Sequence, residues 1–257
     1  MISYFLLTVQ RIVVLSVFCL IWYLLVSYGY VNALFVSSPD AVVKFLFQNF
    51  SGEIFPNALE TLLATLIAFT LSAVSGIAFG LFLYEFAWVK KILDPFLTAM
   101  NSLPRIALAP IFILWFGIGL PSKVALAFSL GFFIVLNSTI AGIKNVDPTL
   151  LRLSKSLGCT PWQQFRKIML PWAVPSIFAG FKLALIYSFL GVVTSEMIAS
   201  KMGLGQLIMY YSGLLRMDAV LAILVVLAIC AVIITYLADK IEAALIGNWI
   251  ETDTLTR

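Results

Sequence analysis

Long apolar runs with few charges constrain this chain more than any other feature of its sequence. The first, residues 12–34, carries no charge. At about 1.5 Å per helical residue it can cross a hydrocarbon layer about 30 Å thick. Of the 257 residues, 62% are hydrophobic and 11% are charged, which is more apolar surface than a soluble domain needs. The sequence therefore predicts an all-α polytopic membrane protein with six transmembrane helices, and the other five are expected at residues 59–83, 92–119, 124–143, 175–199 and 219–238.

The third of these spans is irregular. Pro95, Pro104 and Pro110 interrupt it, and Asn101 and Arg105 lie inside it. Broken helices at membrane depth are tolerated where they face protein or water, and a charge at mid-membrane costs at least about 2.5–3.5 kcal/mol.

Two interpretations of Arg105 satisfy this cost. Arg105 either lines a pathway and favours anionic solutes, or it has a structural role, in an ion pair such as one with Glu196 or by snorkelling from the kink at Pro104.

Composition excludes several kinds of chemistry. The chain has no histidine, so neither a Ser-His-Asp triad nor an HExxH zinc site is possible. No glycine-rich segment ends in Gly-Lys-Ser or Gly-Lys-Thr, so no P-loop is present. Cys19, Cys159 and Cys230 are far apart in the sequence and suggest neither a disulfide framework nor a zinc site. We therefore expect no catalytic residue, no metal site and no cofactor bound by this chain, which makes an intramembrane enzyme a poor interpretation.

Residues 147–177 form the long polar-bearing stretch between two apolar spans, and they predict two short helices. Asp147 and the following proline are a typical helix start. Gly158 favours a break, and Thr160 with Pro161 favours a second start. Pro171 and the proline at 175 are expected to end the second helix.

The second half of this stretch resembles the EAA loop of ABC importer permeases, in which a glycine is followed, after nine residues, by Ile-x-Leu-Pro. The resemblance implies that the loop is a coupling helix that docks into a separate ATPase subunit, where ATP and magnesium would bind. At its start the loop departs from the family, since Arg152, Leu153 and Ser154 stand where Glu-Ala-Ala would be. An ordinary connector between membrane helices is the alternative. The expected ATPase-coupling residues are Arg152, Ser154, Gly158, Pro161, Phe165, Ile168, Leu170 and Pro171.

Residues 103–119, LPRIALAPIFILWFGIG, resemble the permease branch that imports sulfonates, taurine, nitrate and related solutes. Ser38-Pro39 and Gly203-Leu204-Gly205 are similar to the family as well. The resemblance implies a type I permease fold and a translocation pathway for a small anionic solute, delivered by an extracytoplasmic binding protein. A second permease subunit, as a homodimer, is also implied. The pathway candidates are Asn101, Arg105, Asn137, Ser195 and Glu196.

Each pathway candidate has a structural alternative. Asn101, Asn137 and Ser195 could hydrogen-bond a neighbouring helix. Glu196 could gate the outer end, meet the binding protein or simply be an interfacial acid solvated by water.

The chain shows no linker between domains. We expect a first span and an outer interfacial helix, which starts at residue 38, within residues 1–56. A permease domain at 57–246 with its coupling loop at about 144–176 and a cytoplasmic tail at 247–257 are expected to follow. Gly76 and Gly80 form a small-xxx-small pair that we expect to pack helices within the subunit.

Charge asymmetry predicts the orientation. With the amino terminus inside, eleven Lys and Arg residues fall on the inner side and four on the outer side. The inner residues include Lys90, Lys144 and Arg257, and the outer ones include Lys123. We therefore expect a multi-pass protein of the bacterial plasma (inner) membrane with both termini and the coupling loop in the cytoplasm.

The alternative of a different class is a secondary transporter or channel that acts alone. It predicts internal repeats and ion-coupling carboxylates near the midplane. No convincing repeat is present, and the acids lie mostly at the ends of the spans.

Overall fold

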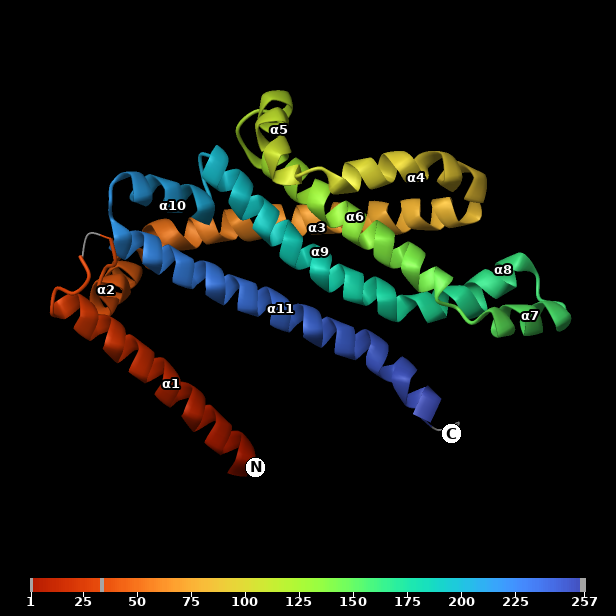
Figure 1. Cartoon of the computed structure of the whole chain (residues 1–257), viewed down its shortest axis with the longest axis horizontal. Coiled ribbons are helices and arrows are strands. Elements are labelled where there is room, and N and C mark those ends of the chain that lie inside the picture. The colour runs from red at the N-terminus through yellow and green to blue at the C-terminus, as the bar shows by residue number, and fades with distance from the viewer. Residues whose placement is uncertain (1, 33–34, 255–257) are drawn as a thin grey trace.

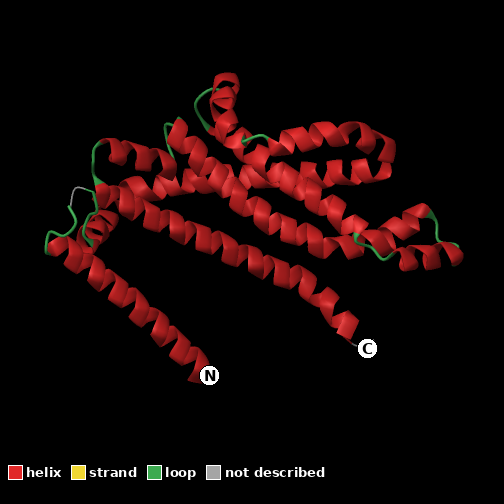
Figure 2. Ribbon diagram, viewed as in Figure 1, coloured by secondary structure: helices red, strands yellow, loops and turns green. Residues whose placement is uncertain are grey.

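The chain is a bundle of helices joined by short loops, as a computed structural model shows (Figures 1 and 2). The structure describes residues 2–32 and 35–254, and no strand occurs among them. The elements are α1 (Ile2–Ser27), α2 (Pro39–Asn49), the π-helical turn η1 (Phe50–Ile54), α3 (Phe55–Glu85), α4 (Ala87–Ser102), the 3₁₀ turn η2 (Arg105–Leu108), α5 (Ala109–Phe116), α6 (Leu120–Lys144), α7 (Pro148–Ser156), α8 (Pro161–Gln164), the π-helical turn η3 (Phe165–Met169), α9 (Leu170–Ile198), α10 (Leu204–Gly213) and α11 (Met217–Thr254).

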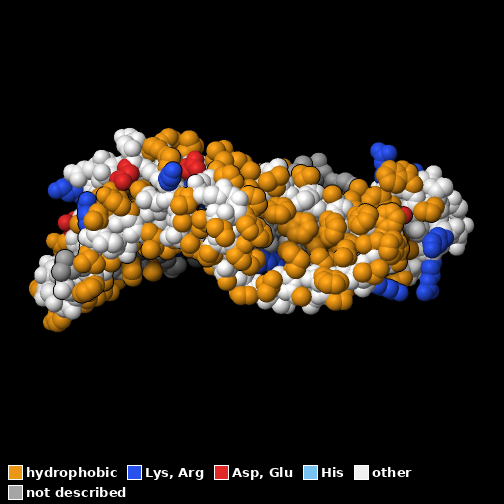
Figure 3. All heavy atoms as spheres, turned by 90° about the horizontal axis from the view of Figure 1, so that it is seen from above, with side chains coloured by type: hydrophobic (Ala, Val, Ile, Leu, Met, Phe, Trp, Pro, Cys, Tyr) orange, Lys and Arg blue, Asp and Glu red, His pale blue; other side chains and the backbone are white. Residues whose placement is uncertain are grey.

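The expected membrane spans are present. In the described part of the chain, five helical segments are long and apolar enough to cross a membrane, and α4 with η2 and α5 makes a sixth span bent by 87°. This break at residues 103–104 confirms the predicted irregular third span and the interruption at Pro104. The expected interruptions at Pro95 and Pro110 were wrong, because Pro95 lies inside α4 and Pro110 lies in the first turn of α5, where a proline is tolerated. In Figure 3 hydrophobic side chains cover the middle of the visible face, and charged side chains gather toward its two ends. This distribution is the one expected of a chain that crosses a bilayer.

Several expected boundaries were wrong. The first span ends at Ser27 rather than residue 34, and residues 33–34 lie outside the described part. The interfacial helix α2 exists, but it continues without a loop through η1 into α3. The short helix α10 was not predicted at all. At the carboxyl end, α11 extends through Thr254 into the expected tail, and Arg257 lies outside the described residues.

The prediction that Pro171 and Pro175 end the second loop helix was also wrong. Both lie in α9, which follows η3 directly, so that helix is continuous from Pro161 to Ile198. Pro171 falls at the first turn after η3, and Pro175 lies inside the helix. Prolines are tolerated in membrane helices because local π-helical adjustment and neighbouring helices compensate for the missing backbone donor.

Small residues let α3, α6 and α9 pack closely. A Cβ atom at Gly131 of α6 would lie 2.7 Å from Ser72 Oγ of α3 and 2.9 Å from Ser188 Oγ of α9. A Cβ atom at Gly76 would lie 2.7 Å from Val135 Cβ, and one at Gly80 would lie 2.9 Å from Thr139 Cβ. The small-xxx-small pair therefore packs α3 on α6 within the subunit, as predicted.

A buried ionic cluster joins the same three helices at the α10 end. Lys123 of α6 is 1% exposed, and its Nζ atom lies 3.3 Å from Glu60 Oε1 of α3 and 3.2 Å from Glu196 Oε1 of α9. Lys123 Nζ also donates to the carbonyl of Met202 at 2.8 Å. One lysine thus binds two membrane helices and the loop before α10. We call Lys123, Glu60 and Glu196 the Lys123 cluster.

The loop before α10 is fitted around the Glu196 carboxylate. Glu196 Oε2 accepts from the Gly205 backbone N–H at 3.0 Å, and Thr61 Oγ1 lies 3.0 Å from both carboxylate oxygens. Gly203 has a φ of 117°, and a Cβ atom there would collide with the carboxylate. Only glycine both adopts this φ without strain and leaves room for the carboxylate, which explains why residue 203 is a glycine.

We expect Lys123→Met to lower the free energy of unfolding by about 3–5 kcal/mol, because the buried carboxylate of Glu196 loses its cation. Thermal unfolding of the detergent-solubilised chain measures this loss.

Lys201→Met is the matched control, since Lys201 is exposed on the same loop, and we expect little change from it. Equal stability of the two variants would show that the Lys123 cluster does not hold α3, α6 and α9 together.

Candidate functional site

Three of the five pathway candidates come together on one side of the bundle. Asn101 on α4, Arg105 on η2 and Asn137 on α6 all border the space between α4 and α6. Ser195 and Glu196 lie elsewhere, near the carboxyl end of α9, and each is 1% exposed. The candidates therefore form two separate groups.

Arg105 is held by backbone oxygens of α6 rather than by a carboxylate. Its Nη1 atom donates to the carbonyls of Ser129 at 3.0 Å and Leu130 at 3.3 Å. Its Nη2 atom donates to Asn101 Oδ1 at 2.5 Å, and the guanidinium lies 4.3 Å from the ring centroid of Phe133. The break after α4 places Arg105 opposite α6, where these carbonyls and this ring stabilise its charge.

These contacts leave the charge of Arg105 without a counter-ion. No ion pair within 4.0 Å involves Arg105 in the described part of the chain. The alternative that Arg105 pairs with Glu196 is therefore wrong, because the carboxylate of Glu196 is bound by Lys123. The alternative of Glu196 as a water-solvated acid is wrong as well, since its side chain is buried.

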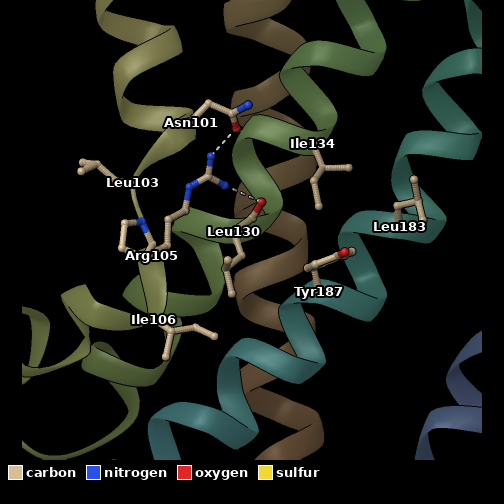
Figure 4. Close-up of a pocket in the computed structure, with 9 residues that line it drawn as sticks. Asn101, Leu103, Arg105, Ile106, Leu130, Ile134, Leu183 and Tyr187 are labelled. Carbon is tan, nitrogen blue, oxygen red and sulfur yellow. Dashed lines mark hydrogen bonds between the residues drawn. The ribbon is translucent and has the colours of Figure 1, made fainter.

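A pocket of about 510 Å³ opens beside Arg105 (Figure 4). Figure 4 shows Arg105 between Asn101 and Leu130, with Tyr187 and Leu183 of α9 across the pocket. Its lining is mostly apolar apart from the Arg105 and Asn101 groups and Tyr187. A cavity of this size with a few polar groups is typical of a small-molecule site, and its fixed charge would favour an anion.

A second pocket of about 440 Å³ follows along α4 and α6 toward the α7–α8 end. Asn101 borders both pockets, and Asn137 borders only the second. The Asn137 side chain is exposed and makes no hydrogen bond to the described residues. It is therefore free to bind a solute or a residue of another chain.

The predicted loop forms two helices that are locked to each other. Asp147 caps α7 by accepting from the Thr149 N–H at 2.7 Å, and this hydrogen bond holds the pKa of the Asp147 carboxyl below its usual value. Gly158 has a φ of 78°, as expected for the break. Thr160 and Gln163 form a reciprocal capping box at the start of α8.

The coupling candidates divide into buried and exposed residues. Ser154 is buried where α7 contacts α8. There, Gln164 Nε2 of α8 donates to Ser154 Oγ at 2.6 Å and to the Leu151 carbonyl at 2.8 Å. Phe165 and Ile168 are half-buried against the core between α6 and α9. Leu170 and Pro171 are half-buried at the start of α9, whereas Arg152, Gly158 and Pro161 are exposed.

Large apolar side chains are exposed at this end as well. Leu153, Leu157 and Trp162 are 55%, 75% and 66% exposed, and they stand among the charged side chains of Arg152 and Lys155. Exposed apolar side chains rimmed by polar groups are typical of an interaction surface. Figure 1 shows α7 and α8 projecting at the end opposite α10.

Two residues that organise these regions were missed. Lys123 was taken as one of the outer surface charges, and no local pattern distinguishes a buried lysine from an interfacial one. Gln164 is the last residue of α8, and its role comes from contacts with Leu151 and Ser154 of α7, which no local pattern of the sequence indicates. Across residues 2–32 and 35–254 no group of three or more Cys, Asp or Glu side chains is arranged to hold a metal ion.

Comparison with known proteins identifies the family. Residues 74–247 match the binding-protein-dependent transport system inner membrane component. The riboflavin transport system permease protein RibX of Chloroflexus aurantiacus is 32% identical over 91% of this chain and 88% of its own length. The putative aliphatic sulfonates transport permease protein SsuC of Bacillus subtilis is 31% identical over 83% of this chain and 78% of its own, which confirms the resemblance to the sulfonate branch.

The fold agrees with this assignment. A chain of the MetNI methionine ABC transporter in an inward-facing conformation superposes with a TM-score of 0.65 at 22% identity, over 74% of this chain and 94% of that one. The six-span all-α architecture of a type I permease, expected from the sequence, is thereby confirmed. The chain is a member of the family of inner membrane components of binding-protein-dependent transport systems, and it is an integral membrane permease subunit of an ABC importer.

Proposed function

We propose that this subunit conducts a small anionic solute along the α4–α6 side of the bundle, driven by ATP hydrolysis on a separate ATPase that docks at α7 and α8. The observation that carries the proposal is Arg105: a charge without a counter-ion, held at a pocket in a broken membrane span. A cation kept in this way attracts anions, and its remaining N–H groups can bind sulfonate or carboxylate oxygens.

The polar side of α4 and α6 supports a second permease subunit. Asn101, Asn137 and Asp94 are exposed on it in a single chain. Polar groups at membrane depth are expected to face protein or water rather than lipid. A second copy of this chain would enclose the two pockets and form the pathway, and an extracytoplasmic binding protein would deliver the solute at the α10 end.

The orientation follows from the charge distribution. Lys90, Lys144, Arg152 and Lys155 lie at or near the α7–α8 end, which is consistent with a cytoplasmic position. The exposed apolar groups of α7 and α8 would fill a groove of the ATPase. Neither ATP nor magnesium would bind to this chain, and both termini would lie in the cytoplasm of the cell.

ATP would drive the cycle through its preference for one of two conformations. Closure of two ATPases moves their grooves together, and the locked α7–α8 pair transmits this movement to α6 and α9 because it is continuous with α9. A ligand shifts a conformational equilibrium only as far as it binds one state better. Here that ligand is ATP on the partner.

We expect Arg105→Ala to reduce uptake of the solute about tenfold or more at low concentration, because the solute loses charge-assisted hydrogen bonds. Uptake into proteoliposomes that contain the assembled transporter measures the effect.

Arg105→Lys tests the same site with its charge retained and is expected to keep part of the activity. The complex must assemble and melt normally in both variants. Unchanged uptake by a properly assembled Arg105→Ala transporter would exclude Arg105 from the pathway.

We expect Gly158→Pro to abolish uptake and to uncouple or release the ATPase. A proline cannot adopt the φ of 78° at this break, so the angle between α7 and α8 must change. Copurification of the ATPase and its activity in the presence of the binding protein measure the loss.

Gly29→Pro is the matched control, because Gly29 has a φ of 73° in the turn that follows α1, far from α7 and α8. The proposal requires that this variant transport much better than Gly158→Pro. Phe165→Glu tests the same interface through a side chain and should also lose uptake.

A further inference from the structure

The second pocket ends at two lysines that the transport proposal does not use. Lys90 lies in the first turn of α4 and Lys144 is the last residue of α6, and both border this pocket. Both side chains face the same small volume, so their two positive charges act on each other. Like charges at such short range repel unless an anion lies beside them.

Nothing in the described part of the chain neutralises this pair fully. No ion pair within 4.0 Å involves Lys90 or Lys144 among residues 2–32 and 35–254. Asp94, one turn along α4, attracts Lys90 but does not reach it, so the three groups together keep a net positive charge.

Helix termini explain only one of the two lysines. A cation in the last turn of a helix is stabilised by the helix dipole, which accounts for Lys144. Lys90 is in the first turn of α4, where the dipole disfavours a cation and favours an anion. The helix dipole therefore does not account for Lys90, which adds to the positive potential at the mouth of the pocket.

The neutral groups of the pocket can donate hydrogen bonds. Asn101 Oδ1 accepts from Arg105, which fixes the amide so that its Nδ2 group remains available to donate. Figure 4 shows the Asn101 oxygen turned toward the Arg105 guanidinium and the amide nitrogen pointing away from it. Asn137, on the opposite helix, makes no hydrogen bond to the described residues.

The spacing of these residues connects the two pockets. Positions 90, 94, 98 and 101 follow the three- and four-residue steps of one face of α4, and positions 130, 134, 137 and 144 share one face of α6. Arg105 follows the break after α4 and borders the first pocket together with Asn101. One polar track thus runs from Arg105 past Asn101 and Asn137 to the lysines. The second pocket has a volume of about 440 Å³, which falls within the range of small-molecule sites.

We propose that Lys90 and Lys144 form a second anion site at the α7–α8 end of this track, which binds an oxyanion such as a sulfonate, carboxylate or phosphate group. One part of this assignment rests on the proposed function, namely that the bound oxyanion is the transported solute after it has left Arg105. The phosphate of an anionic lipid has the same chemistry and could occupy the site from the membrane.

Acetylation of lysines tests the site without a transport assay. The full-length chain, purified with the subunits that accompany it, is placed in nanodiscs of phosphatidylcholine and treated with acetic anhydride. The rate at each lysine is read by mass spectrometry with and without methanesulfonate. A bound oxyanion keeps both amines protonated and covers them, so we expect saturable protection of Lys90 and Lys144. Lys91, exposed on the next position of α4 and outside the pocket, should react unchanged.

A neutral ligand and two variants make the test specific. Dimethyl sulfone has the shape of methanesulfonate without its charge and should not protect. Lys144→Gln should raise the methanesulfonate concentration needed to protect Lys90 about tenfold, because one charged hydrogen bond is lost. Lys91→Gln is the matched control and should leave that concentration unchanged, and both variants must keep the parent's thermal midpoint.

A second arm identifies the source of the anion. Protection that phosphatidylglycerol in the nanodisc produces without methanesulfonate assigns the site to a lipid headgroup, and protection by methanesulfonate in neutral lipid assigns it to the solute. Absence of protection in both arms, or equal protection by dimethyl sulfone, overturns the site. Because the readout does not depend on uptake, an Arg105→Ala transporter with normal uptake would reject the pathway alone and leave this result standing.

Discussion

Lys123 pairs with Glu60 and Glu196, and this ionic cluster ties α3, α6 and α9 together because each helix supplies one of its charges. Gly203 in the following loop and Gly205 in the first turn of α10 close the cluster around Glu196. Charges are costly inside a membrane protein unless they are paired and hydrogen-bonded, so each of these groups fixes the positions of the others. Away from the cluster, glycines on α3, α6 and α9 let these three helices pack closely.

This core gives α6 two different sides. One side packs on α3 and α9, and the other offers carbonyls to Arg105 and the side chains of Asn137 and Lys144 to the second pocket. The bent span of α4 and α5 needs this second side, because a break at membrane depth must find hydrogen-bond partners in protein. Helix α6 therefore contributes one side to the packed core and the other side to the polar track. At its far end α6 leads into α7, so a movement at the loop reaches the track directly.

The sequence predicted features whose cause is local. Runs of apolar residues located the spans, and Asp147, Gly158 and Thr160 located the two helices of the loop because caps and left-handed turns act on their immediate neighbours. The prediction that the prolines of α9 end a helix was wrong, since neighbouring helices and a π-helical turn compensate for the backbone hydrogen bonds that a proline cannot make. Helix α10 was missed because its start is fixed by Glu196 and Thr61, which are distant in sequence.

From the sequence alone it follows that the chain crosses a membrane, that its third span is irregular and that two short helices meet at Gly158. These follow from hydropathy, proline geometry and capping, which act over a few residues. Only the tertiary structure decided that Glu196 binds Lys123 and not Arg105, and that Arg105, Asn101 and Asn137 share one side. Partner choice among charges depends on which helices pack together and at what depth, because an ion pair in a low-dielectric interior forms only between groups that packing brings within a few ångströms.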